Sequence, residues 1–346
     1  MNKKVSASTD ATTYKLGVGL DIGTMNIVSA RLPNGGSGTT VTSRVRDAFL
    51  DLDMDAKRSL KMSKVDYIEK KGQLVIIGDS ALTMANLFKR DARRPLSRGV
   101  ISAGELDAQE VLSLLTHKVL EDPSVEKEHC FYSVPAEPLD DPDQDITFHR
   151  EVFRKIITEH GYTAHPTNEA MAIVFSQCAA ENFSGLAVSF GAGMCNVALA
   201  YMASKGMDFS LARGGDWIDA HAAKAIGKTS GQMCAVKERG INLANPEGRA
   251  QEAIALYVRA LIEYCLQNIE AQFKKVQNDI DLPDPIPFII SGGTSMAKGF
   301  LDVFQEEFAK VEKDFPIAIS EVRSATNPMT AVAEGLLVLA MEEHED

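Results

Sequence analysis

The sequence predicts an α/β protein with two lobes. Its 346 residues are more than one compact core normally holds, so we expect two domains of ordinary size. Segments with strand alternation and segments with helical spacing follow one another along the chain. A strand, a glycine turn and a second strand occur at residues 20–26 and again at residues 189–196. This recurrence indicates a duplicated architecture.

Both of these glycine turns have the composition of a phosphate-binding hairpin. Each follows a short apolar run, at residues 15–20 and 186–188, and leads into another. Glycine allows positive φ and lets backbone N–H groups approach phosphate oxygens. We therefore expect the backbone of both turns to bind phosphate. The expected contacts are Gly23, Thr24, Met25, Asn26, Gly191, Ala192 and Gly193.

The other elements follow from spacing and from turn residues. Apolar residues three and four apart predict helices, and short apolar runs that end at proline or glycine predict buried strands. Asn168 is placed to cap the helix that follows it. The predicted strands lie at residues 41–45, 74–77, 131–135 and 288–290, and the predicted helices at 104–120, 148–160, 171–180, 220–226, 253–273 and 329–341.

A third glycine turn, at residues 291–296, follows the last predicted strand. The three turns in this order, with the segment Glu169-Ala170-Met171 between them, resemble the actin superfamily. The resemblance is greatest to bacterial actin-like proteins of the MreB and MamK type, and it covers residues 16–341. It implies an actin-like, ribonuclease H-like fold, in which each lobe is a mixed sheet flanked by helices, with small inserted subdomains.

The resemblance also implies a division of the chain. The expected parts are a flexible tail at 1–14, a first lobe at 15–160 with an inserted subdomain at about 33–85, a second lobe at 161–324 with an insertion at about 223–270, and a C-terminal helix at 325–346 that returns to the first lobe.

Two carboxylates are the expected catalytic groups, with ATP and Mg²⁺ as the implied ligands. Asp21 is the predicted metal ligand, acting through water, because a buried carboxylate is costly unless it is paired or binds an ion. Alternatively, Asp21 only bonds its own turn. Glu169 is predicted to orient the water that attacks the γ-phosphate, since phosphoryl transfer depends mainly on positioning. Alternatively, Glu169 is a glutamate that the helix dipole favours.

The remaining predicted contacts belong to the nucleoside. Positions near the ribose and base and a turn around the adenosine are carried over from the family pattern, and ATP and GTP both stay open. Lys237 and Glu238 have a simpler interpretation as solvent-facing charges, and Thr294 or Ser295 as a helix cap. The predicted residues are Gly214, Gly215, Asp216, Lys237, Glu238, Gly292, Gly293, Thr294 and Ser295.

The second glycine turn departs from the family pattern. Ser189, Met194, Cys195 and Asn196 stand where carboxylates and hydroxyl residues are usual. Serine and asparagine bring no charge, and methionine cannot hydrogen-bond a water well. Because electrostatic preorganisation is often the largest catalytic contribution, we expect slow hydrolysis with binding retained.

Composition limits the partners and the compartment. The net charge of −12 disfavours nucleic acid and anionic lipid as partners. Five scattered cysteines without metal-ligand spacing fit a reduced, cytoplasmic location. The polar segment 1–13 resembles neither a signal peptide nor a membrane anchor, and no apolar stretch is long enough to span a bilayer.

Self-assembly is the function that the resemblance implies. Head-to-tail contacts between identical subunits do not close and give open filaments, so the expected partner is a second copy of the chain. One alternative is an ATP-binding adaptor of the same fold that scaffolds a membrane, pilus or division complex. Another is a small-molecule kinase, for which no base other than Glu169 is evident.

Overall fold

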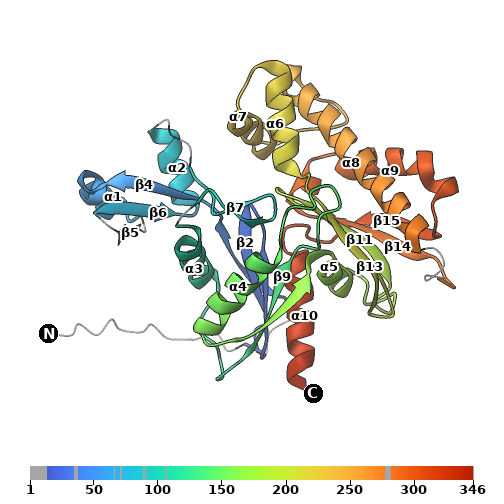
Figure 1. The fold of residues 1–346 in the computed structure, drawn as a ribbon, viewed down its shortest axis with the longest axis horizontal. Coiled ribbons are helices and arrows are strands. Elements are labelled where there is room, and N and C mark those ends of the chain that lie inside the picture. Colours follow the sequence, from blue (N-terminus) through green and yellow to red (C-terminus); the bar gives the residue numbers. More distant parts are fainter. Residues whose placement is uncertain are drawn as a thin grey trace.

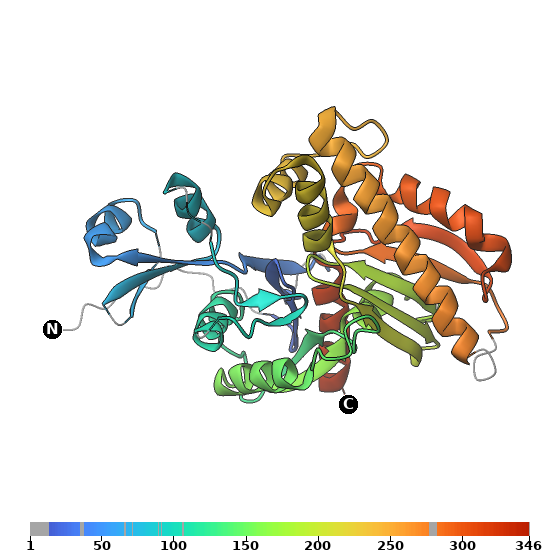
Figure 2. The same cartoon turned by 45° about the horizontal axis from the view of Figure 1, so that its top comes forward.

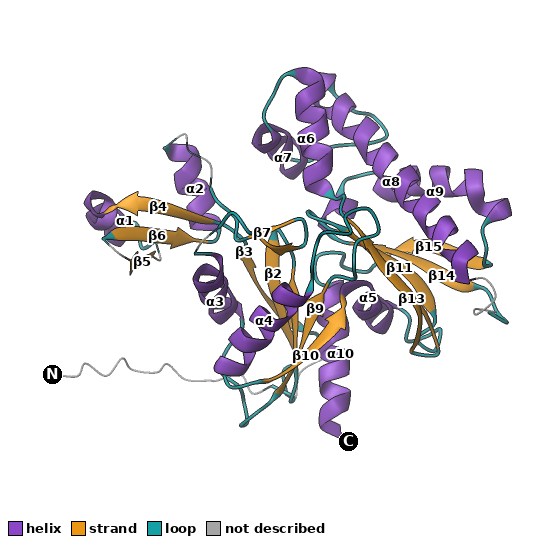
Figure 3. Ribbon diagram, viewed as in Figure 1, coloured by secondary structure: helices purple, strands orange, loops and turns teal. Residues whose placement is uncertain are grey.

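Two mixed sheets form the centre of the protein. The computed structural model describes residues 14–34, 38–65, 67–70, 72–88, 90, 92–105, 107–276 and 282–345, so nearly all of the predicted tail lies outside the described residues. Each sheet has five strands, and helices lie between and outside the sheets (Figures 1 and 3). The predicted α/β class with two mixed sheets is confirmed.

The first sheet has the strand order β10-β9-β1-β2-β3. Neighbours from β1 to β3 are antiparallel, and β1, β9 and β10 are parallel. Two helices, α3 and α4, cover one face, where their apolar side chains pack on those of β1. The elements are β1 (Val18–Ile22), β2 (Asn26–Arg31), β3 (Val41–Arg46), β9 (His129–Val134), β10 (Thr163–Asn168), α3 (Ala108–Val119) and α4 (Thr147–Glu159).

The second sheet repeats this connectivity, with the order β13-β12-β11-β14-β15. Its first three strands are antiparallel and β11, β14 and β15 are parallel. The recurrence of strand, turn and strand in the sequence is therefore a duplication of the sheet. The strands are β11 (Gly185–Phe190), β12 (Cys195–Tyr201), β13 (Ser204–Leu211), β14 (Ile286–Ser291) and β15 (Ile319–Ser324).

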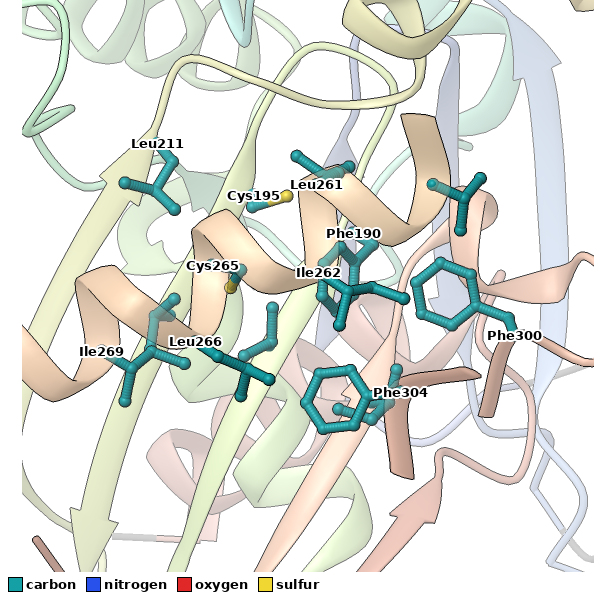
Figure 4. Close-up of a cluster of buried hydrophobic side chains, with 14 of the residues drawn as sticks. Phe190, Cys195, Leu211, Leu261, Ile262, Cys265, Leu266, Ile269, Phe300 and Phe304 are labelled. Atoms are coloured by element: carbon teal, nitrogen blue, oxygen red, sulfur yellow. The ribbon is translucent and has the colours of Figure 1, made fainter. Parts of the chain in front are cut away.

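The outer face of the second sheet carries a large apolar core. Side chains of α8 and α9 pack on alternate residues of β11, β12 and β13. Figure 4 shows Phe190, Cys195 and Leu211 of these strands beside the side chains of α8 and α9. Alternation places every second strand residue on this face, which is why one face is uniformly apolar. The helices are α6 (Gly215–Ile226), α7 (Ser230–Glu238), α8 (Gly248–Val276) and α9 (Phe300–Val311).

A pair of helices, α5 (Glu169–Gln177) and α10 (Ala331–Glu345), lies between the two sheets (Figure 1). Apolar residues of α5 and α10 pack on the inner face of the second sheet, and Ala333 and Leu337 of α10 pack on β2 of the first. Asn168 caps α5 as predicted, since its Oδ1 accepts hydrogen bonds from the N–H groups of Ala170 and Met171 at 2.9 and 3.1 Å.

A small third sheet extends away from the first (Figure 2). It has the order β4-β6-β5 and packs against two short helices. Its residues fall within the expected insertion at 33–85, whereas β3, in the same range, belongs to the first main sheet. The elements are β4 (Phe49–Asp53), β5 (Tyr67–Lys70), β6 (Gln73–Ile77), α1 (Lys57–Met62) and α2 (Asp79–Leu87).

Strand β10 was not predicted. It pairs in parallel with β9 and so belongs to the first sheet, although it follows residue 160, where we expected the first lobe to end. Its six residues are all half-buried and include a proline, so no alternation of buried and exposed residues marks them as a strand. The stretch 223–270, expected as a second insertion, forms the end of α6, α7 and most of α8.

Two further features bear on the environment of the chain. In the part of the chain that the structure describes, we find no helix long and apolar enough to cross a bilayer. The five cysteines are free thiols, and all except Cys234 are buried.

His149 of α4 is expected to make the protein less stable in acid. Its side chain is 1% exposed, and neither ring nitrogen has a hydrogen-bond partner among the described residues. Burial lowers the pKa of His149 to about 4. The unfolded chain, with a histidine pKa of about 6.5, therefore binds more protons than the folded one between these values, and stability falls as the pH drops.

Urea unfolding at about pH 7.5 and about pH 5 measures this effect. We expect His149 to account for a loss of about 2 kcal/mol at the lower pH. His149→Leu should remove that part of the pH dependence. An unchanged pH dependence in the variant would show that His149 does not titrate in this range.

Candidate functional site

A cavity of about 720 Å³ lies where the two sheets and the third glycine turn meet. Most of the predicted site residues line it, whereas Gly214 and Ser295 do not. The predicted residues on its wall are Asp21, Gly23, Thr24, Met25, Asn26, Glu169, Gly191, Ala192, Gly193, Gly215, Asp216, Lys237, Glu238, Gly292, Gly293 and Thr294.

The first two glycine turns have the same backbone geometry. The N–H of Gly23 donates to the carbonyl of Asn26 at 3.0 Å, and the N–H of Gly191 donates to that of Met194 at 2.9 Å. A Cβ at Gly23 would lie 2.9 Å from the carbonyl oxygen of Asn26, and a Cβ at Gly191 would lie 2.9 Å from that of Met194. Both distances are too short for a real side chain. Both turns therefore need glycine at this position, and each presents a residue without a side chain on the cavity wall.

The third glycine turn, at residues 291–296, is hydrogen-bonded to the second glycine turn. Gly292 has φ of +90°, and a Cβ there would meet the backbone of Phe190 at about 2.6 Å. Thr294 Oγ1 donates to the carbonyl of Gly191 at 2.9 Å, and Ser295 Oγ donates to that of Gly292 at 2.7 Å. Ser295 thus holds the turn from behind the cavity wall.

Gly214 supports the second turn from the other side. A Cβ there would lie 2.6 Å from the carbonyl oxygen of Ala192 and 2.7 Å from that of Gly191. The next two N–H groups, of Gly215 and Asp216, donate to the carbonyls of Gly191 and Ala192 at 2.9 and 2.8 Å. The start of α6 can approach the second glycine turn this closely only because residue 214 is glycine. Gly214 itself does not line the cavity.

Asp21 is the last residue of β1 that faces the interior between the sheets before the first turn. Ser133 Oγ, on the neighbouring β9, donates to Asp21 Oδ1 at 2.9 Å and accepts from the N–H of Ile22 at 2.7 Å. Burial raises the pKa of Asp21 to about 6, although the hydrogen bond from Ser133 opposes this. The sequence did not indicate Ser133, because only the pairing of β1 with β9 brings it to the site.

Glu169, the first residue of α5, is the second carboxylate of the cavity. Ser189 Oγ donates to its Oε1 at 2.5 Å, and Asn196 Nδ2 donates to its Oε2 at 2.8 Å. Burial, and then the charge of Asp21, raise the pKa of Glu169 to about 8. Ser189 and Asn196, which the sequence showed only as missing carboxylates, are thus the hydrogen-bond partners of Glu169.

These carboxylates fit a hard divalent cation. Both line the cavity, the charge of Asp21 helps to raise the pKa of Glu169, and oxygen donors are the ligands that Mg²⁺ prefers. Among the described residues there is no group of three or more His, Cys, Asp or Glu side chains that could hold a metal ion. A cation here would therefore be held by Asp21 and Glu169, with water or a bound ligand completing its coordination.

The three charged residues predicted to contact the nucleoside all have protein partners. Asp216 forms a bidentate ion pair with Arg94, at 2.8 and 3.3 Å, and Glu238 forms an ion pair through a single contact with Arg46 at 2.5 Å. Lys237 contacts Asp219 at 2.9 Å and donates to the carbonyl of Gly215 at 2.9 Å.

Arg46 and Arg94 were not predicted as site residues. Arg46 is the last residue of β3, and Arg94 precedes the hairpin β7–β8 (Leu96–Ser97 and Val100–Ile101), whereas their partners lie on α7 and α6. Both ion pairs therefore join the first half of the chain to the second across the cavity.

The tips of the duplicated turns meet at the hairpin β7–β8. The N–H of Gly99, in its turn, donates to Thr24 Oγ1 at 3.0 Å. A Cβ at Gly193 would overlap Thr24 Oγ1 and lie 2.5 Å from the N of Gly99 and 2.9 Å from the Cα of Arg98. This contact between the halves depends on the absence of a side chain at Gly193.

The sequence also matches a known protein family. A family model described as Volactin matches residues 16–340, which is almost the whole chain. The chain belongs to the Volactin family. No curated protein matches this Volactin-family chain.

Solved structures resemble this Volactin-family chain over nearly its whole length. A MamK double helical filament is 19% identical, has a TM-score of 0.70 and is matched over 94% of this chain and 98% of that one. MreB5 of Spiroplasma citri bound to AMPPNP is 16% identical, with a TM-score of 0.62 and coverage of 96% and 97%. The ethanolamine utilization protein EutJ from Carboxydothermus hydrogenoformans is 15% identical, with a TM-score of 0.56 and coverage of 96% and 92%.

These likenesses establish the fold. The predicted actin-like fold, similar to that of MamK and MreB, is confirmed.

Proposed function

We propose that the protein binds ATP with Mg²⁺ between its lobes, assembles head to tail into filaments and hydrolyses ATP slowly. The observation that carries the proposal is the single cavity wall on which two equivalent glycine turns, the third turn and two carboxylates meet. A cavity of about 720 Å³ is within the range of small-molecule sites.

The glycine turns are the phosphate-binding elements in this proposal. Gly23 and Gly191 expose the backbone of their turns on the cavity wall, where N–H groups can bind phosphate oxygens. The turn at Gly292 and Gly293 accommodates the adenosine. The similar fold of MreB5 of Spiroplasma citri, which was solved bound to AMPPNP, supports a nucleotide as the ligand.

Asp21 and Glu169 are the chemical groups of the site. Asp21 would hold Mg²⁺ through water, and a bound Mg²⁺ would neutralise negative charge on the phosphates. Glu169 orients a water toward the terminal phosphate, with its carboxylate held by Ser189 and Asn196. Neither of these partners carries a charge, and Met194 packs against Gly99, so electrostatic help to hydrolysis is small and turnover is slow.

Filament assembly is the biological activity that we propose. The similarity to a MamK double helical filament supports self-association as the quaternary state. We place the protein in the cytoplasm, which suits five free thiols. The neutral Ser189 and Asn196 also favour a second candidate, an adaptor of the same fold that binds ATP for shape and does not polymerise.

Binding and sedimentation measurements with ATP test the proposal. In Mg²⁺, wild-type protein should bind a fluorescent ATP analogue, and Asp21→Ala should lower the affinity at least about tenfold, as expected for loss of one charged contact. Filaments should sediment with ATP and Mg²⁺. Binding without sedimentation at any protein concentration would favour the adaptor, and equal affinity of Asp21→Ala would contradict the assignment of the site.

A further inference from the structure

A row of polar side chains crosses the inner face of the second sheet beside the cavity. Ser210, Asn196, Ser189 and Ser291 occupy paired positions on β13, β12, β11 and β14. At most 2% of any of these residues is exposed. The remaining residues of this face that pack against α5 are alanine or isoleucine. Buried polar groups are costly unless they are hydrogen-bonded, so their partners indicate what the row does.

Part of the row converges on Glu169. Ser189 and Asn196 each donate to a different oxygen of its carboxylate, at 2.5 and 2.8 Å. Ser210 Oγ donates to Asn196 Oδ1 at 2.5 Å, which fixes the orientation of the amide and turns its NH₂ group toward Glu169. The carboxylate is therefore held at both oxygens by neutral donors that are themselves fixed on neighbouring strands.

Because the two sheets are duplicated, each of these donors can be compared with the residue at the equivalent position of the first sheet. Ser189 is the second residue before Gly191, as Asp21 is the second residue before Gly23, and the two strands have equivalent register with their antiparallel neighbours. One lobe thus supplies a carboxylate from its strand, and the other supplies neutral donors that hold a carboxylate from α5. Asp21, at the end of β1, and Glu169, at the start of α5, line the same cavity.

We propose that Ser189 and Asn196 are positioning residues that hold Glu169 as the second carboxylate beside a divalent cation, with Asp21 as the first. Donors to a carboxylate favour its charged form, and neutral donors add no further negative charge to a buried site. Partners of metal-binding groups commonly change metal affinity by about 10- to 100-fold when they are lost. The proposal rests on the cation site of the proposed function, although it does not require the ligand to be ATP.

Thermal unfolding with Mg²⁺ alone, and again with Mn²⁺ alone, is the test. We expect the cation concentration that gives half of the full rise in Tm to increase about tenfold in Ser189→Ala, and Ser189→Thr to stay within about twofold of wild type because it keeps the hydroxyl. The matched control is Ser291→Ala, since Ser291 is equally buried at the paired position on β14 and donates instead to the carbonyl of Pro328 at 3.3 Å. Its cation dependence should not change.

A double-mutant cycle separates positioning from a general loss of packing. If Ser189 acts through Glu169, the change in cation dependence should disappear when Ser189→Ala is made in a Glu169→Gln protein. An undiminished effect in that protein, an equal effect of Ser291→Ala, or a wild-type Tm that no cation raises would each overturn the proposal.

The same experiment with ATP present distinguishes the two proposals. If cations alone raise Tm in a way that depends on Ser189 while ATP adds nothing, the positioning proposal stands and the nucleotide function fails. If ATP and Mg²⁺ raise Tm equally in wild type and in Ser189→Ala, the nucleotide function stands and the positioning proposal fails.

Discussion

Replacing Gly335 with alanine is expected to destabilise the protein by at least about 3 kcal/mol, the upper end of the usual cost of overpacking. A Cβ at Gly335 of α10 would overlap the carbonyl oxygen of Ala172 on α5 and lie 2.6 Å from its carbonyl carbon. Both neighbours are backbone atoms within a helix, so no side chain can move aside. The two helices would have to separate.

The substitution affects more than the contact between α5 and α10, because α10 packs on α5 on one side and on β1 on the other. A Cβ at Gly19 of β1 would overlap the carbonyl oxygen of Ala333 and lie 2.5 Å from the N of Leu337. Moving α10 away from α5 would therefore push it into β1 of the first sheet. We expect Gly335→Ala to be recovered mostly as insoluble protein, or to unfold at much lower urea than wild type.

Gly231→Ala is the matched control for this prediction. Gly231 lies in α7, and a Cβ there would have no atom within 4 Å. Alanine is preferred over glycine in a helix by about 1 kcal/mol, so this variant should be slightly more stable than wild type. A Gly335→Ala protein with wild-type stability would mean that α5 and α10 do not approach as closely as described.

The glycine turns could be predicted from the sequence because their chemistry is local. The hydrogen bond from Gly23 to Asn26 and that from Gly191 to Met194 each close a short turn, and glycine at such a turn shows in the order of residues. The same holds for the cap at Asn168, which acts on residues directly after it. The outline of the fold follows from such turns and from the periodicity between them.

Contacts between distant segments could not be predicted in this way. Arg94 and Asp216, or Arg46 and Glu238, meet only after both main sheets and their helices have formed, and nothing near these residues in the sequence indicates a partner. Glu238 is a predicted contact of the ribose or base, and the structure pairs it with Arg46. Whether it also contacts a nucleotide stays a prediction.

The second glycine turn shows a different limit of prediction from the sequence. The sequence indicated Ser189 and Asn196 as lost charges, because single positions were compared with a pattern. In the structure their side chains donate to Glu169, a residue that the sequence had indicated for another reason. Counting charges therefore missed that a neutral residue can hold a carboxylate that another element supplies.

Gly193→Ala is expected to weaken nucleotide binding about tenfold to a hundredfold while leaving each lobe folded. The new Cβ would overlap Thr24 Oγ1 and press on the backbone of Arg98 and Gly99. To relieve this clash, the turn at Thr24 and the hairpin β7–β8 must move away from the second turn. A steric cost of about 1–3 kcal/mol, felt only when the lobes are together, corresponds to that loss of affinity.

The effect should appear in binding and not in stability. Gly193 lies at a turn, and the three atoms nearest to its Cβ belong to Thr24, Arg98 and Gly99, outside the core of the second sheet, which therefore has no reason to change. Titration with a fluorescent ATP analogue in Mg²⁺, beside urea unfolding, separates the two quantities. Gly104→Ala is the control, because it follows the same hairpin and its Cβ would meet only Ser102 Oγ, at 3.9 Å. Unchanged affinity in Gly193→Ala would show that the two turns need not touch for the nucleotide to bind.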